Sequence, residues 1–160
     1  MTYTKFMLLN AREYNALILG GVFFVLLFNI KNIHAQNVTE SNNMSFGRII
    51  LVSGGGDVIL SPSGQTTTTG SMIASGSPAP GTFDIVGTPN TPVSISFSNQ
   101  VFLNGPGQNM GLRDFNHNAG GTPTLNNLGQ LQFNVGARLI VRASQAQGSY
   151  AGTYDVTVNY

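Results

Sequence analysis

The C-terminal stretch, residues 148–160, constrains the fold more than any other part of the chain. Apolar and aromatic side chains occupy every second position there, with polar side chains between them. The alternating residues are Tyr154, Val156, Val158 and Tyr160. A period of two is that of a β-strand with one buried face and one solvated face. We expect this strand to lie inside a sheet and to help close a β-sandwich.

Similar short segments recur upstream, separated by Gly, Pro, Asn and Ser. They lie at 45–52, 57–61, 70–75, 82–86, 93–98, 101–103, 110–115, 130–135 and 137–143. The first two are expected to pair as a hairpin across Gly54-Gly55-Gly56, and Gly136 is expected to turn the chain between the last two. The threonine-rich run 65–69 fits either a strand or a loop. About eight to ten short strands without sustained helical spacing predict an all-β fold, an antiparallel sandwich or barrel.

The first 35 residues have the pattern of a signal peptide. Basic residues, Lys5 and Arg12, precede a charge-free apolar core at 16–28, and Ile33-His34-Ala35 resembles a cleavage site. We expect a signal-peptide helix that is removed by cleavage after Ala35. The alternative is an uncleaved membrane anchor, although the apolar run is shorter than the roughly 20 residues that span a bilayer. The protein is therefore expected to be exported to the periplasm, the cell surface or the extracellular space, with membrane contact only through the signal peptide.

Behind the signal peptide, 1–35, we expect a flexible polar segment, 36–44, and a single domain, 45–160. The exported part carries four arginines against five carboxylates, so its net charge is near −1 with His117 neutral. It lacks the clustered Lys and Arg that nucleic acid or an acidic membrane surface requires. Cysteine is absent, so the exported domain has no disulfide framework and depends on burial and backbone pairing.

The residue types needed for catalysis are sparse. His117 is the one histidine after residue 35, and no G-x-S-x-G motif positions a serine for nucleophilic attack. A pair of carboxylates for glycoside hydrolysis would come from Asp57, Asp84, Asp114 and Asp155. Solvated strand faces and turns are the better explanation of those four residues. We expect a non-catalytic protein without a cofactor, and a lone histidine does not make a zinc site.

One spacing resembles a calcium-binding loop. Asp114, Asn116 and Asn118 place oxygen atoms at alternate positions, as the ligands of such a loop do. The glycine comes one residue late, at Gly120, and Leu125 occupies the position of the bidentate Glu. The tolerance of Asp and Asn for left-handed turn geometry explains the same residues without an ion.

Several motifs together resemble the bacterial DUF4402 domain family. They are Ser45-Phe46-Gly47, Phe83-x-Ile85-x-Gly87, Met110-x-x-x-x-Phe115, Leu131-x-Phe133-x-Val135-Gly136 and the alternating ending up to Tyr160. The resemblance covers nearly all of the chain after the signal peptide. The ending is also similar to the last strand of spore coat protein U and of archaic chaperone–usher pilin subunits.

The resemblance implies an Ig-like sandwich exported to the periplasm, which in the pilins is completed by a strand lent by a chaperone or a neighbouring subunit. The resemblance to DUF4402 implies a fold and a compartment but no particular activity. This chain departs from the pilin pattern because it lacks cysteine and because Glu40 and Asn42 interrupt the apolar residues before Phe46. A donor strand needs alternating apolar side chains to fill its neighbour's groove.

Two functions fit these features. The first is a structural or surface-assembly subunit, pilus-like or part of an envelope layer, that pairs with itself or with other envelope subunits through sheet edges. Its assembly strand would be Tyr154, Val156, Val158 and Tyr160. The alternative is a secreted module that binds carbohydrate or calcium through the loop 114–127. Carbohydrate sites favour exposed aromatic side chains, but Trp is absent and Tyr150 is the one tyrosine expected to be exposed.

Overall fold

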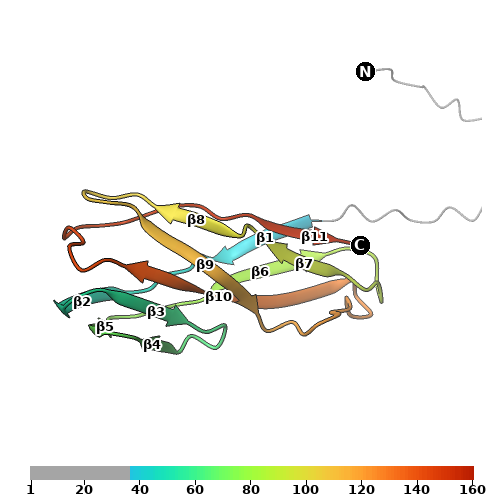
Figure 1. Ribbon diagram of the computed structural model, residues 1–160. Helices are drawn as coiled ribbons and strands as arrows, with labels where there is room; N and C mark the ends of the chain where they lie inside the picture. The colour runs from blue at the N-terminus through green and yellow to red at the C-terminus, as the bar shows by residue number, and fades with distance from the viewer. Residues whose placement is uncertain (1–36) are drawn as a thin grey trace, which may run out of the picture. The chain divides into compact units, whose positions relative to one another are not determined.

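The computed structural model describes residues 37–160, which form β-strands joined by turns and loops (Figure 1). The strands are β1 (Asn37–Asn42), β2 (Arg48–Ser53), β3 (Gly56–Leu60), β4 (Thr66–Thr68), β5 (Ser71–Ser75), β6 (Gly81–Val86), β7 (Ser94–Phe97), β8 (Gln100–Leu103), β9 (Met110–His117), β10 (Gln130–Val141) and β11 (Val156–Asn159). All their pairings are antiparallel, which confirms the predicted fold class. The expected signal peptide lies outside the described residues. Between residues 37 and 160 there is no helix that could span a membrane.

Strand β10 organises the larger, seven-stranded sheet, whose order is β1-β6-β10-β3-β4, with β9 on β10 and β8 on β9. Val135 pairs with Gly81 of β6 and also with His117 of β9. Leu139 pairs with Val58 of β3 and again with a β9 residue. Strands β6 and β3 therefore follow one another along one edge of β10, and β9 occupies the opposite edge.

Gly136 lies inside β10, so the prediction that it turns the chain between two strands is wrong. Its backbone approaches the end of β3 so closely that a Cβ atom would collide with the main chain of Leu60, Ser61 and Pro62. The glycine thus serves a close backbone approach, which keeps the segments before and after it in one strand of 12 residues.

Two pairs of strands, β7 with β11 and β2 with β5, form the second layer on one face of the larger sheet. Ile95 and Val158 pack on the core cluster around Phe133, and Ile49 packs with Met72 on the cluster around Leu139. The predicted hairpin of 45–52 with 57–61 is wrong, because β2 pairs with β5 whereas β3 pairs with β10 and β4. The glycines between β2 and β3 carry the chain from one layer to the other.

The segment 36–44, expected to be flexible, contains β1, which pairs with β6 at the edge of the larger sheet. All six residues of β1 are exposed. Its register has Val38 opposite Ile85 and Glu40 opposite Phe83, and the Asn42 side chain donates a hydrogen bond to the carbonyl of Pro80 at 3.0 Å. The polar sequence agrees with this exposure, and one edge of β1 pairs its backbone with β6.

Candidate functional site

The terminal strand β11 has one open edge. It pairs with β7 in a register that places Val156 opposite Phe97 and Val158 opposite Ile95. Among the described residues β7 is its one strand partner, so β11 is an edge strand and the expectation that it lies inside a sheet is wrong. The side chains of Val156 and Val158 are only half-buried. Unpaired backbone groups along such an edge are able to accept another strand.

Tyr154, expected to belong to the assembly strand, precedes β11 and lies between the layers. Its ring stacks on Phe115 with centroids 5.2 Å apart and meets the edge of Phe83 at 6.1 Å. Its hydroxyl donates a hydrogen bond to Oε1 of Glu40 in β1 at 3.4 Å. Burial, the negative charge of Glu40 and this hydrogen bond all raise the pKa of Tyr154. The phenol is therefore neutral and ties the C-terminal segment to the N-terminal edge strand.

Tyr160, the last residue of the predicted assembly strand, is 40% exposed and lies beside Gly87 at the end of β6. Burial raises the pKa of its hydroxyl. Tyr150, expected to be the exposed tyrosine, is half-buried instead. Its hydroxyl accepts a hydrogen bond from Gln145 and donates one to the carbonyl of Ala146, each at 2.9 Å.

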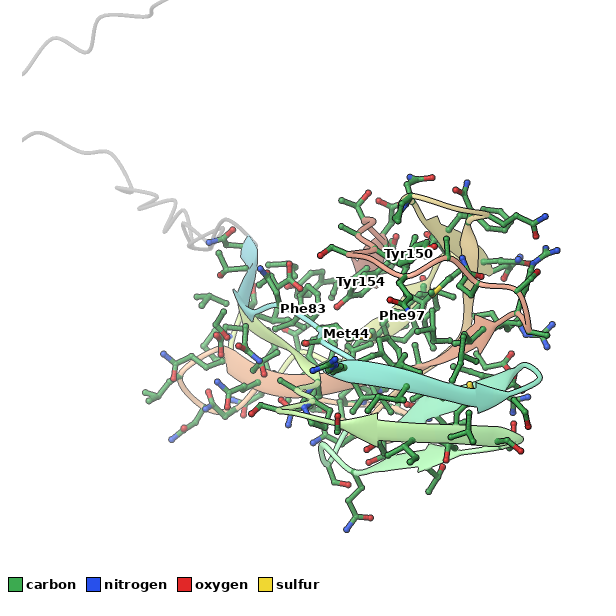
Figure 2. All side chains as sticks on the ribbon, turned by 90° about the vertical axis from the view of Figure 1, so that its left-hand side faces the viewer. Met44, Phe83, Phe97, Tyr150 and Tyr154 are labelled. Carbon is green, nitrogen blue, oxygen red and sulfur yellow. The ribbon has the colours of Figure 1, made fainter. Side chains whose placement is uncertain are left out.

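An aromatic cluster fills the space behind β7 and β11, and Figure 2 shows Phe83, Phe97 and Tyr154 gathered there between the strands. Phe97 stacks on Phe115 with centroids 5.8 Å apart. His117 lies against Phe97 at 5.8 Å and against Phe133 at 5.9 Å, and its Nδ1 accepts a hydrogen bond from the backbone of Ala119. Burial lowers the pKa of His117, so the imidazole is held in its neutral form.

Asp114, the first residue of the calcium candidate, lies in β9 at a β-bulge. Gly136 pairs with Asn116 and Arg138 pairs with Arg113, so two residues of β9 oppose one residue of β10. Asp114 takes the left-handed conformation, with φ of 54°. The bulge changes which positions face the core, because Leu112 faces it before the bulge and Phe115 faces it afterwards.

Two of the three calcium candidates already have partners within the protein. Oδ2 of Asp114 lies 3.1 Å from Nε of Arg138, and Oδ1 of Asn118 accepts a hydrogen bond from the backbone N–H of Asn134 at 2.8 Å. Asn116 is exposed on the strand. Within the part of the chain that the structure describes, no group of three or more His, Cys, Asp or Glu side chains is placed to hold a metal ion.

The structure brings two of the four candidate carboxylates together. Asp57 and Asp114 flank Arg138 on the outer face of the larger sheet, at 3.6 Å and 3.1 Å. The other two lie elsewhere, with Asp84 accepting a hydrogen bond from Gln132 and Asp155 accepting one from Ser98. Because Arg138 stands between the first pair, the arrangement is that of a surface ion-pair network.

The family match covers the same residues that the structure describes. The family described as "Domain of unknown function (DUF4402)" matches residues 37–160. The chain belongs to the DUF4402 family. No curated protein and no solved structure matches it. The DUF4402 match begins with the first residue of β1 and ends with Tyr160, so the family unit contains the edge strands β1 and β11 and the Glu40–Tyr154 hydrogen bond.

Sequence reasoning missed β1 as part of this DUF4402 domain. The polar sequence of 37–42 hides it, because an exposed edge strand needs no apolar alternation. A usable signal was the absence of Gly and Pro from 37–46, which leaves no turn before the next segment. Arg138 was also missed, since its pairing with Asp57 and Asp114 depends on the register of three strands.

Proposed function

We propose that this DUF4402 protein is an exported, non-catalytic structural subunit of a pilus-like or envelope layer. It joins copies of itself or other envelope subunits by pairing of β-strands. The observation that carries the proposal is the open edge of the terminal strand β11, which pairs with β7 alone among the described residues. A neighbouring strand added there would satisfy the free backbone groups and extend the smaller sheet.

The side chains at this edge support the same role. Val156 and Val158 are half-buried although they pack against the apolar cluster behind the sheet of β7 and β11. A lent strand with alternating apolar residues would remove more of their surface from water, at about 25 cal/mol per Å² of apolar area. The similarity of the ending to spore coat protein U and to archaic pilin subunits agrees with this mode of pairing.

Export and charge fit an envelope subunit. The signal-peptide pattern of 1–35 supports delivery to the periplasm, the cell surface or the exterior. The few and balanced charges of the exported part favour protein partners over nucleic acid. Strand pairing at an edge depends on backbone groups and so requires no cofactor.

The test is the size of the native protein in extracts of the envelope, compared between the natural chain and two lysine variants. Thr157 is exposed in β11, so Thr157→Lys adds a charge at the open edge without disturbing the core. The matched control is Thr122→Lys, in the loop 118–129, where Thr122 is also exposed. We expect the natural chain and the control to migrate as assemblies and Thr157→Lys to migrate as a monomer. A monomeric natural chain would contradict the proposal.

A further inference from the structure

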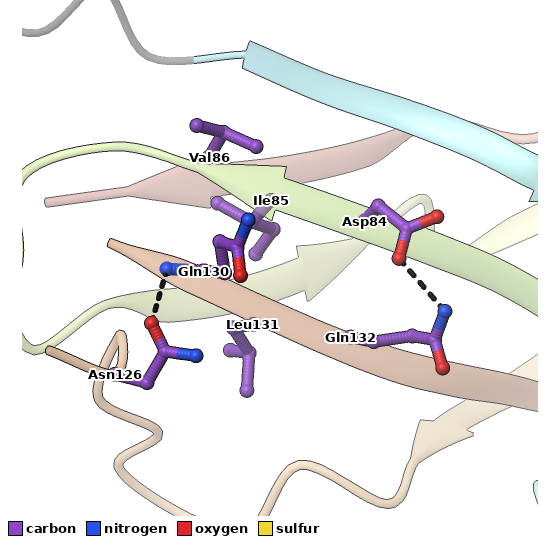
Figure 3. Close-up of a pocket in the computed structure, with 7 residues that line it drawn as sticks. All are labelled: Asp84, Ile85, Val86, Asn126, Gln130, Leu131 and Gln132. Carbon is purple, nitrogen blue, oxygen red and sulfur yellow. Dashed lines mark hydrogen bonds between the residues drawn. The ribbon is translucent and has the colours of Figure 1, made fainter. Parts of the chain in front are cut away.

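The outer face of the larger sheet carries a hollow of about 430 Å³ where β6, β10 and the loop before β10 meet (Figure 3). Its lining residues are Asp84, Ile85, Val86, Asn126, Gln130, Leu131 and Gln132. Its volume falls within the range of small-molecule sites. We propose that this hollow binds a neutral carbohydrate. This would be a binding activity separate from strand pairing, because β11 belongs to the other layer.

The pairing of β6 with β10 arranges the polar groups. Asp84 is opposite Gln132, and Val86 is opposite Gln130. Side chains alternate between the faces of a sheet, so these four residues share the outer face while Phe133 and its neighbours fill the core. Gln132 donates a hydrogen bond from Nε2 to Oδ1 of Asp84 at 2.8 Å, as Figure 3 shows. The carboxylate and the carboxamide therefore hold each other in place before any ligand arrives.

Asn126 contributes a third fixed group. Its Oδ1 accepts hydrogen bonds from the backbone N–H groups of Gln130 at 2.8 Å and of Leu128 at 2.9 Å. These two bonds occupy the acceptor capacity of its carbonyl oxygen, so its Nδ2 group is left as an oriented donor. Asn126 is the one lining residue that comes from the loop 114–127 suggested by the sequence.

The chemistry of the lining selects the ligand class. Asp84 provides acceptors, and the carboxamides of Asn126, Gln130 and Gln132 provide both donors and acceptors, which suits hydroxyl groups that donate and accept at once. The lining contains no Lys, Arg or His, so nothing in it neutralises an acidic ligand. Val86 is 44% exposed and offers an apolar surface to the C–H face of a sugar ring. A neutral saccharide matches this combination.

The test is calorimetric titration of the purified full chain with neutral di- to tetrasaccharides of glucose, galactose, mannose and N-acetylglucosamine, and with uronic acid counterparts. We expect saturable binding of at least one neutral saccharide. Gln132→Ala should weaken that binding about tenfold or more, as the loss of hydrogen bonds at a ligand site does. The matched control is Gln100→Ala, because Gln100 is exposed in β8 and is not among the lining residues.

Three results would overturn the proposal. One is that no neutral saccharide binds at about 10 mM, a concentration that detects millimolar affinity. Another is a preference for the uronic acids. The last is that Gln132→Ala and Gln100→Ala have the same affinity for the saccharide, whether both match the natural chain or both are weakened. Binding by Thr157→Lys separates this proposal from the assembly role, because that variant keeps the hollow whether or not it assembles.

Discussion

The hydroxyl of Tyr154 donates a hydrogen bond to the carboxylate of Glu40 across 114 positions of sequence. Glu40 lies in β1, the first strand of the family unit, and Tyr154 lies two residues before the start of the last strand. The aromatic ring of Tyr154 also contacts Phe83 and Phe115, which come from β6 and β9. One side chain therefore connects an exposed edge strand to the core and to the strand proposed for assembly.

Two substitutions at Tyr154 separate its hydroxyl from its ring. Tyr154→Phe removes the bond to Glu40 and keeps the aromatic contacts, so we expect the free energy of unfolding to fall by less than about 1 kcal/mol. Tyr154→Ala also removes the ring and should cost about 3 kcal/mol. Urea denaturation measures both values. Glu40→Gln is the control, because it keeps an acceptor oxygen for the hydroxyl of Tyr154. Equal losses of unfolding free energy in Tyr154→Phe and Tyr154→Ala would show that the ring contributes nothing.

Acid should weaken the fold through His117. Burial lowers its pKa in the folded protein below the ordinary value of 6.5, so the unfolded chain takes up a proton first as the pH falls. The contribution of the neutral imidazole is complete above about pH 6.5 and declines as the pH falls from there toward the lowered pKa. His117→Phe keeps an aromatic ring against Phe97 and Phe133 and cannot titrate. The free energy of unfolding should therefore change less between about pH 4 and 7 for the variant than for the natural chain. An equal change in both proteins would contradict the role of His117.

The sequence predicted the fold class because period-two alternation reports which face of a strand is buried. It predicted the partners poorly. The assignment of β2 and β3 to different layers, and the passage of β10 through Gly136, depend on contacts between segments far apart in the chain. Alternation also fails at the bulge of β9, where Asp114 shifts the core-facing phase between Leu112 and Phe115.

Alternation also predicted the candidate assembly strand, but only in part. The alternation of Tyr154, Val156 and Val158 identified the strand but not its open edge, since an edge is a property of the neighbours. The hollow beside Asp84 and Gln132 could not be predicted either, because outward polar residues are the pattern of any solvent-exposed strand face. Only the register between β6 and β10 places them side by side.

The close approach of β10 to the end of β3 makes Gly136 sensitive to any side chain. Gly136→Ala would place a methyl group against the backbone of Leu60 and Pro62, which cannot move as the end of a side chain can. We expect it to lower the free energy of unfolding by about 2 kcal/mol or more, as overpacking of a core does. Gly121→Ala is the control, because a Cβ atom there meets nothing within 4 Å, and its effect should stay within about 0.5 kcal/mol. Equal effects of the two substitutions in thermal or urea unfolding would refute this account of Gly136.

Calcium provides the last prediction, because the bulge residue Asp114 has a competing partner. A calcium ion would have to draw the carboxylate of Asp114 away from Arg138 and the amide oxygen of Asn118 away from the backbone of Asn134. The three side chains, two in β9 and Asn118 just after it, carry four oxygens, fewer than the six to eight ligands that calcium takes. We expect the Tm to be unchanged on adding calcium to about 1 mM, well above the dissociation constants of sensor sites. A rise in Tm that Asp114→Ala abolishes and that Asp155→Ala, on the other layer, leaves intact would instead establish a calcium site at the bulge.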